Sequence, residues 1–132
     1  MQALEPFQAD VGEVARGHDV FRAVLFTGEH SQLVVMSLRP GEDIGDEVHD
    51  VDQLFYFVEG TGETVLDGRS SVLEKGQVLV VPSGTRHNIR NNGLGPMKLL
   101  TIYAPPQHAA GTIHRTKAEA MAEEEHPEVQ VR

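Results

Sequence analysis

The middle of the chain alternates short runs of apolar residues with polar turn sequences. The apolar runs are rich in Val, Leu, Ile, Phe and Tyr, and Gly, Asn, Asp or Pro separates one run from the next. Their pattern predicts strands at residues 21–27, 32–38, 52–58, 63–66, 71–73, 78–81, 87–90 and 97–103. Because dense turn signals leave no helical period between the runs, we expect an all-β antiparallel sandwich or barrel.

Two turn signals are specific enough to predict local geometry. Asp67-Gly68 lies between two short apolar runs, which favours a hairpin with a type I′ turn, because that turn needs positive φ at both central residues. Pro82 follows an apolar run and is expected to end that strand, since it has no N–H to donate to a ladder.

The two ends of the chain differ from the middle. Residues 1–20 form an N-terminal segment that we expect to be an edge strand or coil, and residues 21–104 form the barrel. Residues 105–132 are expected to hold a loop, a short helix at 116–125 and an acidic tail. Thr116 and Glu119 have the spacing of a capping box at the start of that helix.

Composition bounds the class of protein. The chain has 132 residues, 39% apolar and 23% charged, which is typical of one folded domain. It has no cysteine, so disulfides, thiolate metal sites and cysteine nucleophiles are excluded. It shows no apolar run long enough to span a bilayer and no secretory signal pattern, so we expect a soluble cytoplasmic protein.

The formal net charge of −9 is concentrated in one segment. Residues 41–74 contain ten acidic residues and one basic residue, and the rest of the chain is balanced. Binding to phosphate backbones or anionic lipid needs clustered Lys and Arg. We therefore expect neither nucleic acid nor a membrane as partner, and a small molecule instead.

Four polar residues in two segments carry the candidate chemistry. Glu47 and His49 share one face of an extended segment, Gln53 opens the next strand, and His87 follows a Pro-Ser-Gly turn. Two imidazoles, a carboxylate and an amide oxygen suit divalent Fe, Mn, Ni, Co or Zn. The alternative is a site without metal, in which these groups hold water or bond to each other.

The spacing of these residues resembles the two motifs of the cupin family. Gly41, Glu47, His49, Gln53 and Gly60 keep the spacing of the first motif, G-x5-H-x-H-x3,4-E-x6-G, with Glu in place of the first His and Gln in place of the Glu. The second motif, G-x5-P-x-G-x2-H-x3-N, is matched in full by residues 76–91. The resemblance implies a small single-domain cupin: a double-stranded β-helix (jelly-roll) barrel that holds a divalent metal at Glu47, His49, Gln53 and His87 and forms a homodimer.

Other polar residues leave alternatives open. His108 and His114 follow the last strand, where they either belong to loop structure or reach the site as acid or base. Tyr103 either lines the cavity or lies at the rim. We expect three further histidines to be surface residues: His18, His30 and His126.

Several functions fit this reading. We expect a metal-dependent enzyme with dioxygenase or lyase-like chemistry on a small organic substrate in the barrel mouth, without assigning a catalytic residue. The first alternative is a non-catalytic binding or sensing cupin, and a further one is a sugar or sugar-phosphate isomerase. Strand parity directs Arg86 and Arg90 outward, which leaves Arg22 and Arg39 as cations for a phosphate. No phosphate-cradle, dinucleotide or nucleophile-elbow motif is present.

Overall fold

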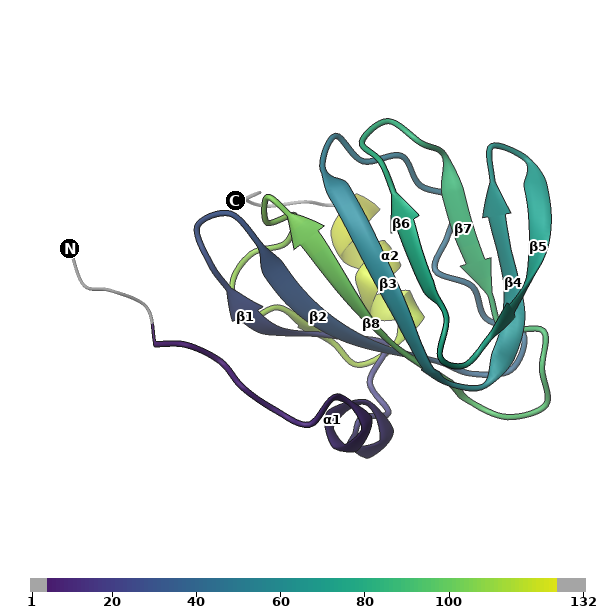
Figure 1. Ribbon diagram of the computed structural model, residues 1–132, viewed down its shortest axis with the longest axis horizontal. Helices are drawn as coiled ribbons and strands as arrows, with labels where there is room; N and C mark the ends of the chain where they lie inside the picture. The colour runs from purple at the N-terminus through teal and green to yellow at the C-terminus, as the bar shows by residue number, and fades with distance from the viewer. Residues whose placement is uncertain (1–4, 126–132) are drawn as a thin grey trace.

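Two antiparallel sheets lie face to face in the computed structural model, which describes residues 5–125 (Figure 1). The strands are β1 (Arg22–Thr27), β2 (Gln32–Leu38), β3 (Asp52–Glu59), β4 (Thr61–Leu66), β5 (Arg69–Glu74), β6 (Val78–Val81), β7 (His87–Arg90), β8 (Met97–Ala104) and β9 (Ile113–His114). Two helices flank them, α1 (Val11–Gly17) and α2 (Lys117–Glu125). The all-β expectation is confirmed, with the short C-terminal helix in its predicted place.

The larger sheet has the strand order β6-β3-β8-β2-β1-β9 and the smaller one β5-β4-β7. The segment before β3 runs beside β7, with bridges from Asp43 to Arg90 and from Glu47 to His87. This segment lies along β7 at the edge of the small sheet. Its pairing with β7 brings the two predicted motif segments side by side.

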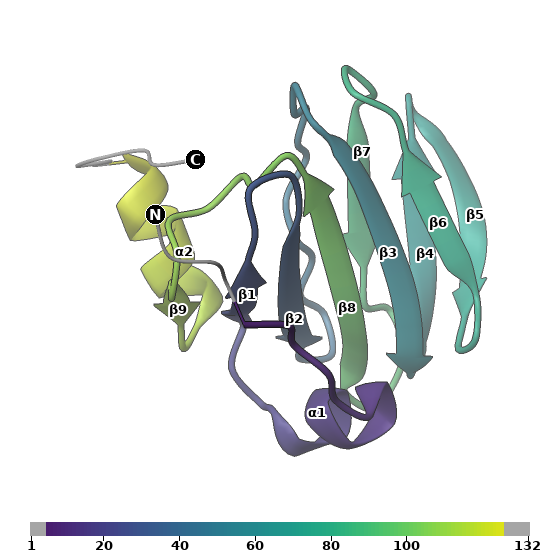
Figure 2. The ribbon, with the colours of Figure 1, turned by 60° about the vertical axis from the view of Figure 1, so that its left-hand side comes forward.

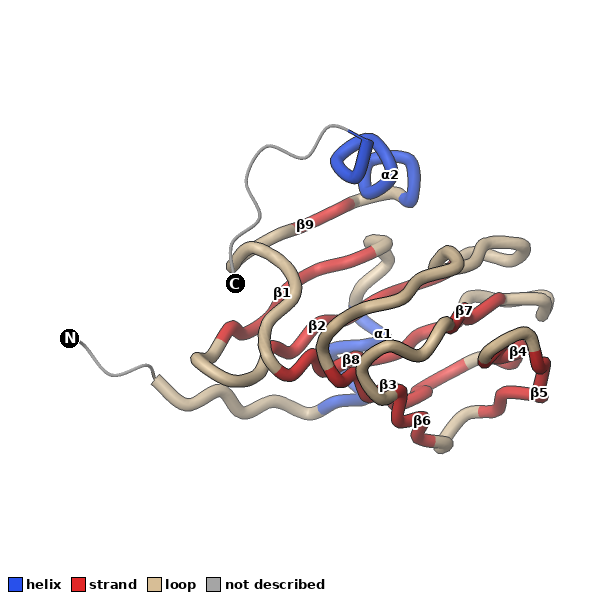
Figure 3. Tube along the Cα trace, turned by 90° about the horizontal axis from the view of Figure 1, so that it is seen from above, coloured by secondary structure: helices blue, strands red, loops and turns tan. Residues whose placement is uncertain are grey.

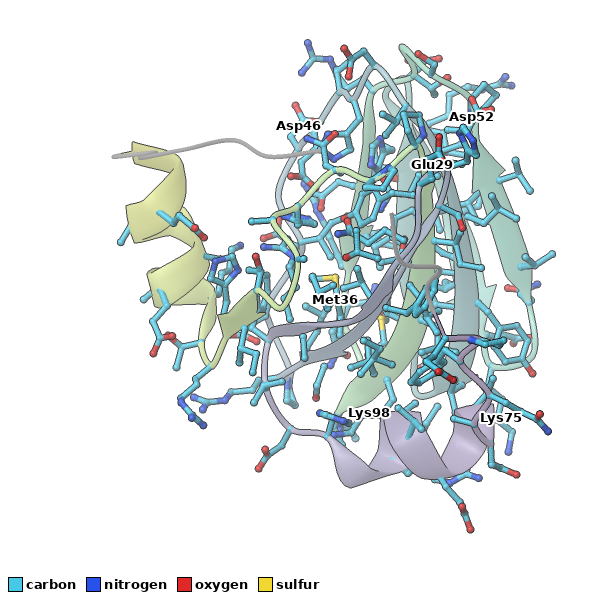
Figure 4. All side chains as sticks on the ribbon, turned by 90° about the vertical axis from the view of Figure 1, so that its left-hand side faces the viewer. Glu29, Met36, Asp46, Asp52, Lys75 and Lys98 are labelled. Atoms are coloured by element: carbon cyan, nitrogen blue, oxygen red, sulfur yellow. The ribbon has the colours of Figure 1, made fainter. Side chains whose placement is uncertain are left out.

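The core lies between the sheets and follows the period of two expected for strands. Phe55 and Phe57 on β3, Met36 on β2 and Leu99 on β8 are at most 1% exposed and belong to one apolar cluster. Figure 4 shows Met36 inside the molecule, between the ends of the barrel. These side chains fill the barrel below the mouth.

The predicted turns form as expected. Asp67 and Gly68 have φ angles of 48° and 84°, and Leu66 pairs with Arg69, which is a type I′ hairpin. Strand β6 ends at Val81, directly before Pro82. The eight predicted strands correspond to β1–β8, whereas the two-residue β9, which pairs with β1, was not predicted.

The expectation of an edge strand or coil for residues 1–20 is wrong for α1. Asp10 caps this helix by accepting a hydrogen bond of 2.9 Å from the Glu13 N–H. Ala15 is fully buried against Ala23 and Leu100 on the outer face of the large sheet. A seven-residue helix that contains two glycines is too short to show a helical period, so its tertiary packing determines it.

Helix α2 is a structural part of the barrel. The Glu119 N–H donates to the Thr116 hydroxyl at 3.2 Å, which confirms the predicted cap. Ala120 is 3% exposed and lies in the main core cluster, and Lys117 pairs with Asp43 on the segment before β3. Figures 2 and 3 show β9 and α2 together beyond β1 at one edge of the large sheet. Within the described residues, no helix is long and apolar enough to cross a membrane.

Candidate metal centre

Glu47, His49 and His87 converge at the mouth of the barrel. One potential ligand atom from each lies within 4.8 Å of the other two. The Glu47 Oε1 and His49 Nε2 atoms are 3.6 Å apart, and the His49 and His87 ring centroids are 5.5 Å apart. The sequence spacing therefore predicted three side chains that the fold does bring together.

Backbone pairing holds the first and last of these residues in place. The Glu47 N–H donates to the His87 carbonyl and the His87 N–H donates to the Glu47 carbonyl, each at 2.9 Å. The Gly84 N–H donates to the His49 carbonyl at 2.8 Å. The Pro-Ser-Gly turn before β7 thus holds the backbone at His49, and the pairing with Glu47 holds the backbone at His87. These backbone hydrogen bonds join the two motif segments.

The ring of His87 is buried and oriented. Its Nδ1 lies 2.9 Å from the Thr85 carbonyl, which can only accept, so Nδ1 carries the proton. Its Nε2 then presents a lone pair, and this atom is buried without a hydrogen-bond partner. A backbone carbonyl behind a histidine is the usual support of a metal-ligating imidazole.

Gln53 also has a free acceptor at this mouth. It is 1% exposed, and its Nε2 donates to the Thr101 hydroxyl at 2.9 Å, while that hydroxyl donates to the Leu54 carbonyl at 2.9 Å. These bonds fix the amide orientation and leave Oε1 buried without a partner. The place of Gln53 among metal ligands stays a prediction.

The unpartnered atoms fit a cation. His49 Nε2, Gln53 Oε1 and His87 Nε2 are buried polar atoms without a hydrogen-bond partner among the described residues, and a buried polar atom without a partner destabilises a protein. The Glu47 carboxylate adds a negative charge beside them. Together these donors suit a divalent transition metal, although they do not select one.

Tyr103 and His108 border the candidate metal-ligand group, which consists of Glu47, His49 and His87. The Tyr103 ring lies edge-on to the His49 and His108 rings, with centroid distances of 5.8 Å and 5.1 Å. The Tyr103 hydroxyl lies 3.3 Å from His108 Nε2. Burial raises the pKa of Tyr103 to about 12, against the opposing charge of Arg22. Burial lowers the pKa of His108 to about 3, and the charge of Arg22 adds to that shift. Near neutral pH, this pair is a protonated phenol beside a neutral imidazole.

Sequence reasoning did not name Gln32, named Arg22 only as a cation for a phosphate, and left open whether His114 reaches the site. Arg22 is 4% exposed and its Nη1 lies 3.0 Å from His114 Nδ1. Gln32 is 1% exposed, donates to the His108 carbonyl at 2.8 Å and accepts from the His108 N–H at 2.9 Å. The signal that could have found Arg22 and Gln32 is parity, because each shares the inner face of its strand with apolar core residues.

The remaining histidines lie away from the site or beyond what the structure describes. His30 is exposed, as expected, and His18 is half-buried with its carbonyl bonded to Lys98. His126 lies outside the described residues.

Acidic residues gather at the mouth, and several of them are paired. Figure 4 shows Glu29, Asp46 and Asp52 at one end of the molecule, with Lys75 and Lys98 at the other. Asp46 pairs with Arg86 at 2.8 Å, which confirms that Arg86 faces outward.

Asp43 and Glu63, two further acids of the segment 41–74, are paired as well. Burial raises the pKa of Asp43, but hydrogen bonds from Asn88 and Lys117 outweigh it, and the net pKa is lowered. Glu63 pairs with Arg90 at 3.3 Å, so Arg90 also faces outward. The acidic segment is therefore less negative than a count of its acids indicates.

Comparison with known proteins finds similarity over most of this chain. The uncharacterized protein YrkC of Bacillus subtilis is 41% identical over 92% of this chain and 69% of its own length. The polyketide synthase protein CurC of Streptomyces cyaneus is 32% identical over 94% of this chain and 86% of its own length. The crystal structure of the BH2720 protein from Bacillus halodurans is 41% identical, with a TM-score of 0.87 over 89% of this chain and 95% of that one.

A family model also matches more than half of the chain. The Cupin domain family matches residues 34–103, which span β2 to β8 and include all four predicted ligands. The chain belongs to the cupin family.

Proposed function

We propose that this cupin is a metal-dependent enzyme that acts on a small organic molecule at the barrel mouth, by dioxygenase or lyase-like chemistry. One observation carries the proposal: Glu47, His49 and His87 present ligand atoms within 4.8 Å of one another, and both imidazoles keep an unpartnered Nε2. A two-histidine, one-carboxylate set leaves coordination positions open for substrate.

Each ligand residue has a separate role in this proposal. His49 and His87 supply neutral nitrogen donors, Glu47 supplies the negative charge, and Gln53 adds a neutral oxygen. When bound, a divalent metal in such a set polarises a substrate oxygen, and iron additionally supports oxygen chemistry. With only one carboxylate in the set, the bound dication keeps residual positive charge.

The surrounding residues of this chain position the substrate and hold protons. The Tyr103 hydroxyl keeps its proton near neutral pH and shares a hydrogen bond with His108. The buried Phe55 ring packs edge-on against the His87 ring, with 6.0 Å between the ring centroids, and gives the site an apolar neighbour. A substrate at the mouth thus meets a hydroxyl donor on one side and the predicted ligands on the other.

The relative CurC supports a small organic substrate, because it carries the name polyketide synthase and is covered over most of its length. The isomerase alternative gains one observation, since Arg22 is a buried cation on the inner face of β1. A non-catalytic binding cupin remains the other alternative. The homodimer and the cytoplasmic location stay predictions.

Reconstitution with single metals tests the proposed function. Protein stripped with a chelator is loaded separately with Fe(II), Mn, Ni, Co or Zn and assayed against small hydroxy acids, keto acids, diketones and sugars. We expect chelation to lower the melting temperature and abolish turnover, because the metal binds only the folded site.

The metal that restores activity distinguishes the reaction classes. Oxygen consumption with iron and none with zinc, which is redox-inert, indicates a dioxygenase. Turnover with zinc or manganese and no oxygen consumption indicates lyase-like chemistry. Binding of panel compounds without turnover by any loaded form contradicts the enzyme and favours the binding alternative.

A further inference from the structure

Arg22 is a buried cation that forms no ion pair with any side chain in the described part of the chain. It is 4% exposed, and on β1 it pairs with Met36 of β2 and His114 of β9, so its side chain lies on the inner face of the large sheet. Arginine is always charged in proteins, and buried charges are normally paired. Among the described side chains, no carboxylate lies within ion-pair distance of Arg22.

The contacts of Arg22 leave part of its guanidinium free. Its Nη1 lies 3.0 Å from His114 Nδ1, and its carbon lies 5.2 Å from the Phe21 ring centroid. Its Nε is buried without any hydrogen-bond partner. Because guanidinium only donates, His114 Nδ1 must accept, and the proton of this imidazole then lies on Nε2, which contacts Glu123.

The Arg22 guanidinium acts on two side chains that border the candidate metal centre. Its charge acts on both Tyr103 and His108, and Tyr103 lies edge-on to His49. Tyr103 is therefore a neighbour of both Arg22 and the predicted ligand His49. A molecule seated beside Tyr103 would meet both the positive charge of Arg22 and a metal bound at the predicted ligands.

We propose that Arg22 binds the carboxylate of a small organic acid that is the ligand of the metal centre. This inference rests on the proposed function and names its substrate class. A bound dication and one guanidinium oppose the single Glu47 carboxylate, so the interior attracts an anion although the exterior is acidic. One free Nε–H edge suits a carboxylate, whereas a phosphate dianion needs several cations or free backbone N–H groups.

Carboxylate binding can be measured first on the wild-type protein. Calorimetric titration of the manganese-loaded protein with pyruvate, acetate and malonate is compared with titration by the corresponding neutral amides. We expect at least one acid to bind about tenfold or more tightly than its amide, because the amide lacks the charge that Arg22 recognises. Equal binding of every acid and amide, or binding of none, overturns the proposal.

Two variants then assign that preference to Arg22. Arg22→Met should remove the tenfold preference for the acid and Arg22→Lys should keep part of it, while Arg86→Met, at the exposed Asp46 pair, should keep all of it. Loss of the preference in Arg86→Met, or its retention in Arg22→Met, contradicts the assignment. Arg22-dependent binding of inorganic phosphate that is tighter than that of any acid also overturns it, in favour of a phosphorylated ligand.

Two further readouts separate this proposal from a structural role and from the metal proposal. An unpaired buried charge destabilises the free protein, so Arg22→Met should melt at the wild-type temperature or above it, whereas a structural arginine would lower the melting temperature when replaced. Manganese content is measured in each sample. An acid preference without bound metal contradicts the metal centre alone, and bound metal without an acid preference contradicts the Arg22 assignment alone.

Discussion

The two polar atoms of the Gln53 amide differ in their hydrogen bonding. Its amide N–H donates to the Thr101 hydroxyl, and its Oε1 is buried without a hydrogen-bond partner among the described residues. An amide buried only for structure would have both ends satisfied, because an unpartnered oxygen destabilises the fold. This asymmetry is the reason to regard Gln53 as a neutral ligand rather than a core residue.

Substitution of Gln53 measures that role. Gln53→Leu should lower metal affinity about tenfold or more, and Gln53→Glu should raise it, because a carboxylate attracts a dication more strongly than an amide does. Metal titrations of both variants check this result. The exposed Gln77→Leu is the matched control. Unchanged affinity in both Gln53 variants would limit the ligand set to Glu47, His49 and His87.

At the residue scale, local spacing predicted which candidate ligands come together, but it did not predict the contacts around them. Glu47 and His49 are two residues apart on an extended segment, so their common face follows from strand geometry. Arg22 and His114 are 92 positions apart and meet only because β9 pairs with β1. A two-residue strand has no pattern of its own, and its position depends on the rest of the fold.

At the element scale, the β-strands leave a pattern in the sequence and could be predicted, whereas α1 could not. Strands with a buried and an exposed face show a period of two, and Gly, Asp and Pro mark their turns, so β2, β6 and β7 were predicted with their observed bounds. Helix α1 has one buried residue, Ala15, and is stabilised by contact with the outer face of the large sheet. Such a helix leaves no periodic signal in the sequence.

Helix α2 was predicted from its cap, but its packing was not. Ala120 looks like any other alanine of a polar helix, yet it is 3% exposed in the main core cluster. The contact of Lys117 with Asp43 joins the same helix to the segment that carries Glu47 and His49. The helix therefore stabilises the barrel and the mouth together.

A charge placed on each face of α2 tests this role. Ala120→Asp should lower the free energy of unfolding by about 2–4 kcal/mol, because it buries a carboxylate without a partner. Ala122→Asp on the exposed face should change it by less than about 1 kcal/mol. Urea denaturation measures both, and equal effects of the two substitutions would show that α2 does not contribute to the core.

At the scale of the whole molecule, the net charge of −9 has a definite location. The acidic segment at residues 41–74 includes Glu47 of the metal-ligand group, while Asp43, Asp46 and Glu63 within it are compensated by basic partners. These pairs reduce the negative charge that faces solvent. The buried candidate ligand atoms at His49, Gln53 and His87, by contrast, have no hydrogen-bond partner among the described residues, and they fit a divalent metal.

Metal content tests this central claim most directly. Protein without an affinity tag is purified without added metal, and elemental analysis is done on the wild type, His87→Ala and the exposed-site control His30→Ala, with circular dichroism to verify folding. We expect close to one equivalent of a divalent transition metal per chain in the wild type and in His30→Ala, and loss of it in folded His87→Ala. A wild type that binds no metal even after incubation with Fe, Mn, Ni, Co and Zn, or a His87→Ala variant that keeps its metal, would contradict the account.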